Sequence, residues 1–100
     1  MKENYDNSLM DYANYDGGVE RNLPCVFRID DKEVFFSFRE DGEQSFRGRA
    51  TKDGHYALVN TTGDSARLTL HRTPGSATIE GYYVYPGITE GLLRIHLEKA

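Results

Sequence analysis

A two-residue alternation of apolar and polar side chains runs through the chain from Leu23 to its C-terminal end. In an extended strand this period turns every second side chain to the same face of a sheet. Seven runs follow the rule, at positions 25–29, 34–38, 46–50, 56–59, 66–70, 77–84 and 93–97. No amphipathic pattern of ordinary helix length interrupts them. The sequence therefore predicts an all-β domain of about seven short strands.

Turn signals separate these runs and keep the connections short. Four dipeptides carry the signal: Asp41-Gly42, Asp53-Gly54, Pro74-Gly75 and Pro86-Gly87. Short connections pair neighbouring strands in antiparallel order, which gives a meander. An open sheet of this size would leave one apolar face in water, so we expect it to curl on itself or to split into two packed sheets. Gly48 and Gly81 stand at inward positions, where glycine favours strong coiling and a closed or nearly closed barrel.

Two of the runs share a pattern in which a glycine precedes an aromatic or arginine-bearing strand half. They are Phe46–Ala50, with the sequence FRGRA, and Ile79–Tyr83, with the sequence IEGYY. In architecture the chain resembles the small up-and-down barrels of the avidin and lipocalin families. The chain has no tryptophan, although such barrels often use this residue. The resemblance therefore implies the fold only, and no ligand or site residue is carried over from it.

The first 22 residues differ in composition from the rest. Five acidic residues stand against two basic ones in this segment. Tyr5, Leu9 and Tyr12 follow helical spacing, and Gly17-Gly18 would end such a helix. A helix this short needs a surface to pack on. We expect residues 1–22 to form an acidic polar segment ahead of a barrel domain at 23–100. The segment would be a mobile tail, a short helix, a lid or an eighth strand.

Length and composition limit the classes of function. The 100 residues, 38% of them hydrophobic, supply one small core in a single domain. No apolar run reaches the length of a membrane span and the N-terminal residues have no signal-peptide core, so we expect a cytoplasmic protein. Twelve basic residues against sixteen acidic ones give a net charge of −4, which disfavours a strongly basic nucleic-acid binder. A monomer and a homodimer formed through an exposed edge strand are both admissible.

The sequence offers little for catalysis or metal binding. Cys25 with one of the three histidines is the only formal pair of nucleophile and base, but Cys25 follows the apolar alternation of its strand. It is expected to be buried and inert. Glu80 is expected on the solvent face unless its register slips by one residue, and Glu40-Asp41 is interpreted as a turn. We predict no enzyme, no metal site and no cofactor.

Two groups of side chains are candidates for binding a partner. The basic group alternates outward on three strands and comprises Arg47, Arg49, Arg67, His71, Arg94 and His96. Clustered, these side chains would suit a phosphate backbone or an acidic protein; spread around a barrel wall, they keep the surface soluble. The second group is made of tyrosines: Tyr82, Tyr83 and Tyr85, with Tyr12 and Tyr15 from the first segment. Such rings anchor protein partners or close the ends of small barrels by packing.

We therefore expect a non-catalytic small β-barrel that binds a protein partner, as an inhibitor, immunity or adaptor protein does. The expected core consists of Phe27, Ile29, Val34, Phe36, Phe38, Phe46, Leu58, Leu68, Leu70, Ile79, Leu93, Ile95 and Leu97. This set looks sufficient to fill a small barrel, which leaves little room for a ligand. One alternative is a small-molecule carrier, because Gly48 and Gly81 remove side-chain volume; it predicts a cavity of roughly 300 Å³ or more. Another is a nucleic-acid contact through the arginines.

Overall fold

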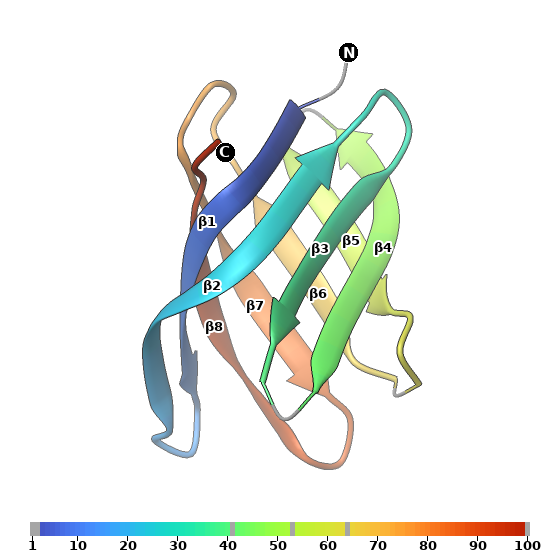
Figure 1. Cartoon of the computed structure of the whole chain (residues 1–100). Helices are drawn as coiled ribbons and strands as arrows, with labels where there is room; N and C mark the ends of the chain where they lie inside the picture. The colour runs from blue at the N-terminus through green and yellow to red at the C-terminus, as the bar shows by residue number, and fades with distance from the viewer. Residues whose placement is uncertain (1–2, 41, 53, 64, 100) are drawn as a thin grey trace.

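Eight antiparallel strands follow one another as a meander and close into a barrel (Figure 1). The computed structural model describes residues 3–40, 42–52, 54–63 and 65–99, and these residues form no helix. The strands are β1 (Glu3–Asn14), β2 (Val19–Ile29), β3 (Val34–Arg39), β4 (Glu43–Lys52), β5 (His55–Asn60), β6 (Arg67–His71), β7 (Thr78–Tyr85) and β8 (Thr89–His96). The predicted all-β antiparallel barrel is confirmed, with one strand more than expected.

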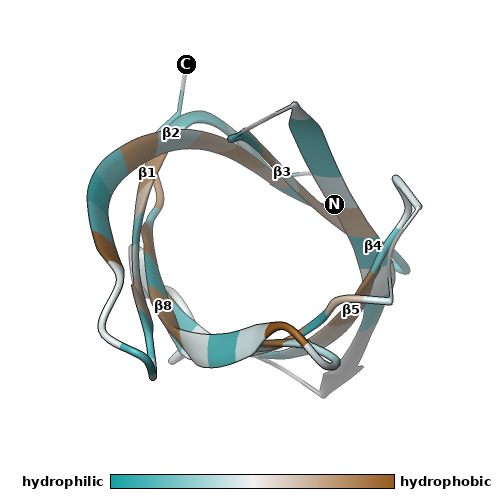
Figure 2. Ribbon diagram, turned by 90° about the horizontal axis from the view of Figure 1, so that it is seen from below, coloured by the Kyte–Doolittle hydropathy of each residue, from teal (hydrophilic) through white to brown (hydrophobic). Residues whose placement is uncertain are grey.

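The additional strand comes from the N-terminal segment, and it closes the barrel. β1 pairs with β2 on one side and with β8 on the other, where residues 9–14 lie opposite residues 91–96. Figure 2, a view along the barrel, shows the resulting ring of strands. The mobile-tail and short-helix alternatives are therefore wrong for the described part of residues 1–22, and the eighth-strand alternative is confirmed. β2 begins at Val19 and runs through the boundary expected after residue 22, so both parts belong to one barrel.

Irregular pairing changes which side chains of β1 face the barrel interior. The register with β2 shifts between Tyr5 and Ser8 and again between Met10 and Tyr12. Such a shift adds a residue on one strand and changes which side chains face inward. Tyr5, Ser8 and Met10 are buried as a result, although a strict alternation would not place all three on one face. The Ser8 hydroxyl donates to the Tyr5 carbonyl oxygen at 2.9 Å and accepts from the backbone N–H of Glu98 at 3.0 Å, which ties the C-terminal residues to the irregularity.

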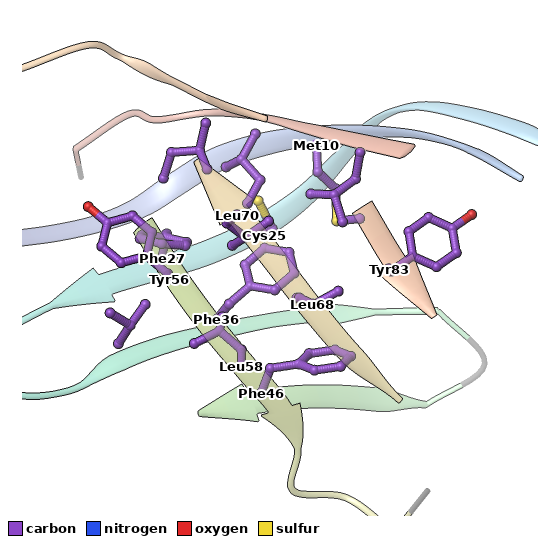
Figure 3. Close-up of a cluster of buried hydrophobic side chains, with 14 of the residues drawn as sticks. Met10, Cys25, Phe27, Phe36, Phe46, Tyr56, Leu58, Leu68, Leu70 and Tyr83 are labelled. Atoms are coloured by element: carbon purple, nitrogen blue, oxygen red, sulfur yellow. The ribbon is translucent and has the colours of Figure 1, made fainter. Parts of the chain in front are cut away.

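The hydrophobic core occupies the barrel interior (Figure 3). The expected core residues are buried, apart from Ile29 and Phe38, which are half-buried against the core. Phe27, Phe36 and Phe46 are completely enclosed. Burying a side chain of this size stabilises a fold by about 1.5–3 kcal/mol. Further residues complete the core: Tyr5, Met10, Cys25, Tyr56, Ala66 and Tyr83.

Gly48 and Gly81 allow neighbouring strands to approach closely. A Cβ atom at Gly48 would lie 1.9 Å from the carbonyl oxygen of Ala57 on β5. At Gly81 it would lie 2.0 Å from the carbonyl oxygen of Thr69 on β6. No side chain fits at such distances, so glycine is required at both positions. The close backbone approach expected at these two positions is confirmed.

One predicted turn can be followed in detail. The N–H of Ser76 donates to the carbonyl oxygen of Thr73 at 2.9 Å, and Gly75 has a φ of 83°. This geometry is the one that a Pro-Gly pair favours, because the third turn residue needs a positive φ. Asp41 and Asp53, the first residues of the two expected Asp-Gly turns, lie outside the described residues.

Candidate functional site

The two ends of the barrel differ in how their interiors are filled. At the end where β1 begins, the Arg72 side chain is only 10% exposed and lies beside Tyr5 and Glu3. The Arg72 Nε donates to the carbonyl oxygen of Ser76 at 2.7 Å, and its Nη1 lies 3.7 Å from Glu3 Oε1. The Tyr5 hydroxyl donates to the Glu3 carboxylate, and this hydrogen bond, with burial, raises the pKa of Tyr5. Paired polar groups therefore occupy this end.

The opposite end contains a half-open cavity of about 280 Å³. Its apolar floor is formed by core side chains from five strands: Met10, Phe36, Phe46, Leu68 and Leu93. In Figure 3 the Tyr83 hydroxyl points away from the core cluster. The expectation that side chains fill the whole interior is therefore wrong at this end. The alternation places enough apolar residues along the barrel, but the long β1–β2 and β7–β8 hairpins extend the wall beyond them (Figure 1).

Aromatic rings form much of the wall above the floor. Tyr83 meets Tyr12 edge to face with ring centroids 6.0 Å apart, and it meets Tyr85 in the same way at 5.9 Å. Across the cavity, Phe38 and Phe46 stack with an interplanar angle of 12° and centroids 6.2 Å apart. Edge-to-face pairs direct the face of one ring toward the edge of its neighbour, and the faces carry partial negative charge. The wall is thus apolar and can also interact with a cation.

A few polar groups converge on the same cavity. The Tyr12 hydroxyl lies 2.8 Å from each oxygen of the Glu40 carboxylate, to which it donates. The Tyr83 hydroxyl donates to the side-chain oxygen of Asn14. Burial, followed by the hydrogen bond to Glu40, raises the pKa of Tyr12, and burial raises the pKa of Tyr83 to about 12. Both phenols are therefore neutral donors at neutral pH, and the Glu40 carboxylate is held in a fixed position at the rim.

Glu40 is the site residue that sequence reasoning missed, because Glu40-Asp41 was interpreted only as a turn. A signal for it was present. Val34, Phe36 and Phe38 occupy every second position of β3 and face inward, and Glu40 continues this spacing beyond the last residue of the strand. A carboxylate in phase with an apolar inner face is expected to point toward the interior. In the structure Glu40 is half-buried and lines the cavity.

The predicted tyrosine group divides into two sets. Tyr12, Tyr83 and Tyr85 lie together in the cavity wall. Tyr83 is buried, so it is not the exposed anchor that the sequence suggested. Tyr82 points outward from the next position of β7 and is 45% exposed, while Tyr15 in the β1–β2 turn is 66% exposed. The five rings therefore do not form one surface.

The predicted basic group does point outward, but several of its members are paired with acids. Arg47 Nη1 lies 2.6 Å from Glu33, and Arg94 Nη2 lies 3.0 Å from Glu80. A third pair links His96 Nε2 with Asp11 at 3.2 Å. The group as a whole (Arg47, Arg49, Arg67, His71, Arg94 and His96) is spread over β4, β6 and β8, which are not neighbours. Neighbouring acids lower the positive potential of this surface, so it carries no proposal of a nucleic-acid contact.

The sequence candidates for catalysis lie apart from the cavity. Cys25 is buried, and burial raises the pKa of its thiol to about 12. Glu80 lies on the solvent face, as expected, because its strand keeps one register with β8. His55 lies directly opposite His71, with their Nδ1 atoms 2.8 Å apart, a contact that sequence reasoning did not anticipate. Within the described residues no three His, Cys, Asp or Glu side chains are grouped to hold a metal ion.

Comparisons with protein-family models, with curated proteins and with solved structures find no match to this chain. In the part of the chain that the structure describes, no helix is long and apolar enough to cross a membrane.

Proposed function

We propose that this chain is a non-catalytic binding protein that holds a small amphipathic molecule in the open end of its barrel. The observation that carries the proposal is the contrast between the two ends. One end is occupied by Arg72 and its partners, whereas the other holds a cavity of about 280 Å³ with an apolar floor, an aromatic wall and a few polar groups. Ligand sites commonly combine these three features.

The size of the cavity limits the ligand. Pockets for small molecules commonly enclose roughly 300–1,000 Å³, so this cavity suits a ligand near the lower bound, with one or two rings or a short chain. The apolar part would lie against Phe38 and Tyr85, which line the cavity and are half-buried, and the polar part would lie near Glu40 and Asn14 at the rim. The hydroxyls of Tyr12 and Tyr83 hold these two acceptors in place.

A matched pair of tryptophan substitutions tests the proposal. Thr89 is the first residue of β8, is half-buried and lines the cavity, whereas Thr78 is the first residue of β7, is equally half-buried and lies at the other end of the barrel. We expect the two-ring fluorescent probe 2-naphthol to bind saturably, with one molecule per chain. Thr89→Trp should abolish this binding because the indole fills the mouth, and Thr78→Trp should preserve it. Equal binding by both variants and the unmodified chain would contradict the proposal.

A protein partner on the outer wall is the second candidate function. Its support is a shallow depression containing exposed apolar side chains: Tyr82 and Leu92, which pair across β7 and β8, and Val19 on β2. A Tyr82→Ser/Leu92→Ser double variant should lose a specific partner in a pull-down, whereas Val59→Ser, which alters an exposed apolar residue on β5, should keep it. If both variants retain the partner, this surface is not the site at which the partner binds. The expected cytoplasmic location and the choice between monomer and homodimer stay predictions.

A further inference from the structure

We propose that the ligand of the open-end cavity is an organic cation, with a protonated amine on an aromatic or aliphatic body. This inference rests on the proposed function and adds the chemical class of the ligand. It follows from the charge, the free acceptor capacity and the rings found at one place in the barrel.

The charge at the cavity has one sign. Among the described residues that line it, Glu40 is the only one with a formal charge at neutral pH. A half-buried carboxylate without a cation among the described residues of the same lining favours a ligand that brings the opposite charge. A ligand with its own carboxylate, such as a fatty acid, would instead place two negative charges together at the mouth.

Glu40 retains acceptor capacity for a ligand. The one hydrogen bond donor that reaches its side chain from the described residues is the Tyr12 hydroxyl, which lies 2.8 Å from both oxygens. A carboxylate offers about four acceptor positions, and one hydroxyl supplies one proton. An ammonium group has three donors and no acceptor, so it complements the positions that remain. Hydrogen bonds between such charged groups are roughly twice as strong as neutral ones.

The surrounding rings are suited to the same group. Tyr12, Tyr83, Tyr85 and Phe38 line the cavity together with Glu40. A cation over an aromatic face is attracted by the partial negative charge of the ring, and this attraction is stronger in desolvated sites. An uncharged alcohol of the same shape would lack this attraction, and it would offer the carboxylate a single donor and no opposite charge.

Acidic residues beyond the lining add to the negative field. Burial raises the pKa of Tyr83 to about 12, and smaller contributions in the same direction come from Tyr85, from Asp16 in the β1–β2 turn and from Glu40. Glu20 on β2 contributes in the same direction at Tyr12. A negative potential at a mouth raises the local concentration of cations and speeds their association, and the effect weakens with added salt.

Three probes with one body and different head groups test the inference by titration calorimetry at neutral pH and low salt. They are 4-phenylbutylamine, 4-phenylbutan-1-ol and 4-phenylbutyrate. We expect the amine to bind at least tenfold more tightly than the alcohol, and the acid to bind most weakly. Glu40→Gln keeps the shape and an acceptor for Tyr12 but removes the charge, so it should abolish the advantage of the amine over the alcohol. Glu43→Gln, an exposed position at the start of β4, is the matched control and should leave this advantage unchanged.

The outcomes separate the inference from the proposed function. If the alcohol binds and Thr89→Trp abolishes its binding, but the amine has no advantage, the cation is excluded and the cavity remains a ligand site. An amine advantage that survives Glu40→Gln also overturns the inference. If none of the three probes binds the unmodified chain saturably, both proposals fail. Circular dichroism establishes whether each variant is folded. If Glu40→Gln does not fold, the affinities of the amine and the alcohol for the unmodified chain decide whether the ligand is a cation.

Discussion

Gly48→Ala provides the sharpest test of the barrel geometry. The new Cβ would lie 1.9 Å from the Ala57 carbonyl oxygen and 2.9 Å from Leu58 Cδ2. An ordinary contact begins near 3.4 Å, so β4 and β5 would have to separate by more than 1 Å. Gly48 and Leu58 face each other in the ladder, and separation there weakens about two backbone hydrogen bonds, each contributing about 1 kcal/mol. Overpacking adds about 1–3 kcal/mol, so we expect a loss of about 3–5 kcal/mol in the free energy of unfolding.

Urea denaturation followed by far-ultraviolet circular dichroism measures this loss. Gly75→Ala is the matched control, because Gly75 has a φ of 83° but nothing within 4 Å of a Cβ. Its cost is confined to backbone strain, of order 1 kcal/mol. A domain of this size is stable by about 5–15 kcal/mol, so Gly48→Ala should remove a large share of this stability and Gly75→Ala only a small one. If the two variants have equal midpoints, the close approach of β4 and β5 is not what requires glycine at position 48.

Two further predictions concern the core. Phe36→Ala should lower the free energy of unfolding by about 3–5 kcal/mol in the same urea assay, because the wholly enclosed ring leaves a cavity among Phe27 and Phe46; a loss below 1 kcal/mol would contradict its central position. Cys25 should react with a maleimide far more slowly in the folded chain than in urea, since burial raises the pKa of its thiol to about 12 from 9.0. The unfolded chain loses this proton first, so the contribution of Cys25 to stability is complete below pH 9 and declines between pH 9 and 12. Cys25→Ala should remove the part of this decline in stability between pH 9 and 12 that the thiol causes. If the dependence of stability on pH is the same in the variant, the raised pKa of Cys25 is contradicted.

Much of the barrel could be predicted because its signals are local. The side chains of Phe27, Phe36 and Leu68 face inward by simple alternation, which depends only on the geometry of an extended backbone. Pro74-Gly75 predicts its turn from the conformations that these two residues prefer. The first strand escaped this reasoning because two shifts in its register with β2 break the alternation of its side chains.

The cavity could not be predicted in the same way. Its floor and wall bring together Tyr12 from β1, Phe38 from β3 and Tyr83 from β7, and no spacing in the sequence relates these positions. Whether inward side chains fill a barrel depends on how their volumes meet across it and how far the hairpins extend the wall. Glu40 is the clearest example. The sequence shows that Glu40 continues the inward spacing of β3, but it does not show that Tyr12 of β1 lies beside the Glu40 carboxylate.

The sequence by itself therefore determined the fold class, the antiparallel meander, most of the core and the need for glycine at positions 48 and 81. Only the tertiary structure decided that residues 3–14 form the closing strand, that Arg72 occupies one end, and that the other end is hollow beside a carboxylate. The physical reason is the range of the interactions. Alternation and turn preference act between adjacent residues, whereas barrel closure and cavity formation depend on contacts between residues far apart in the chain.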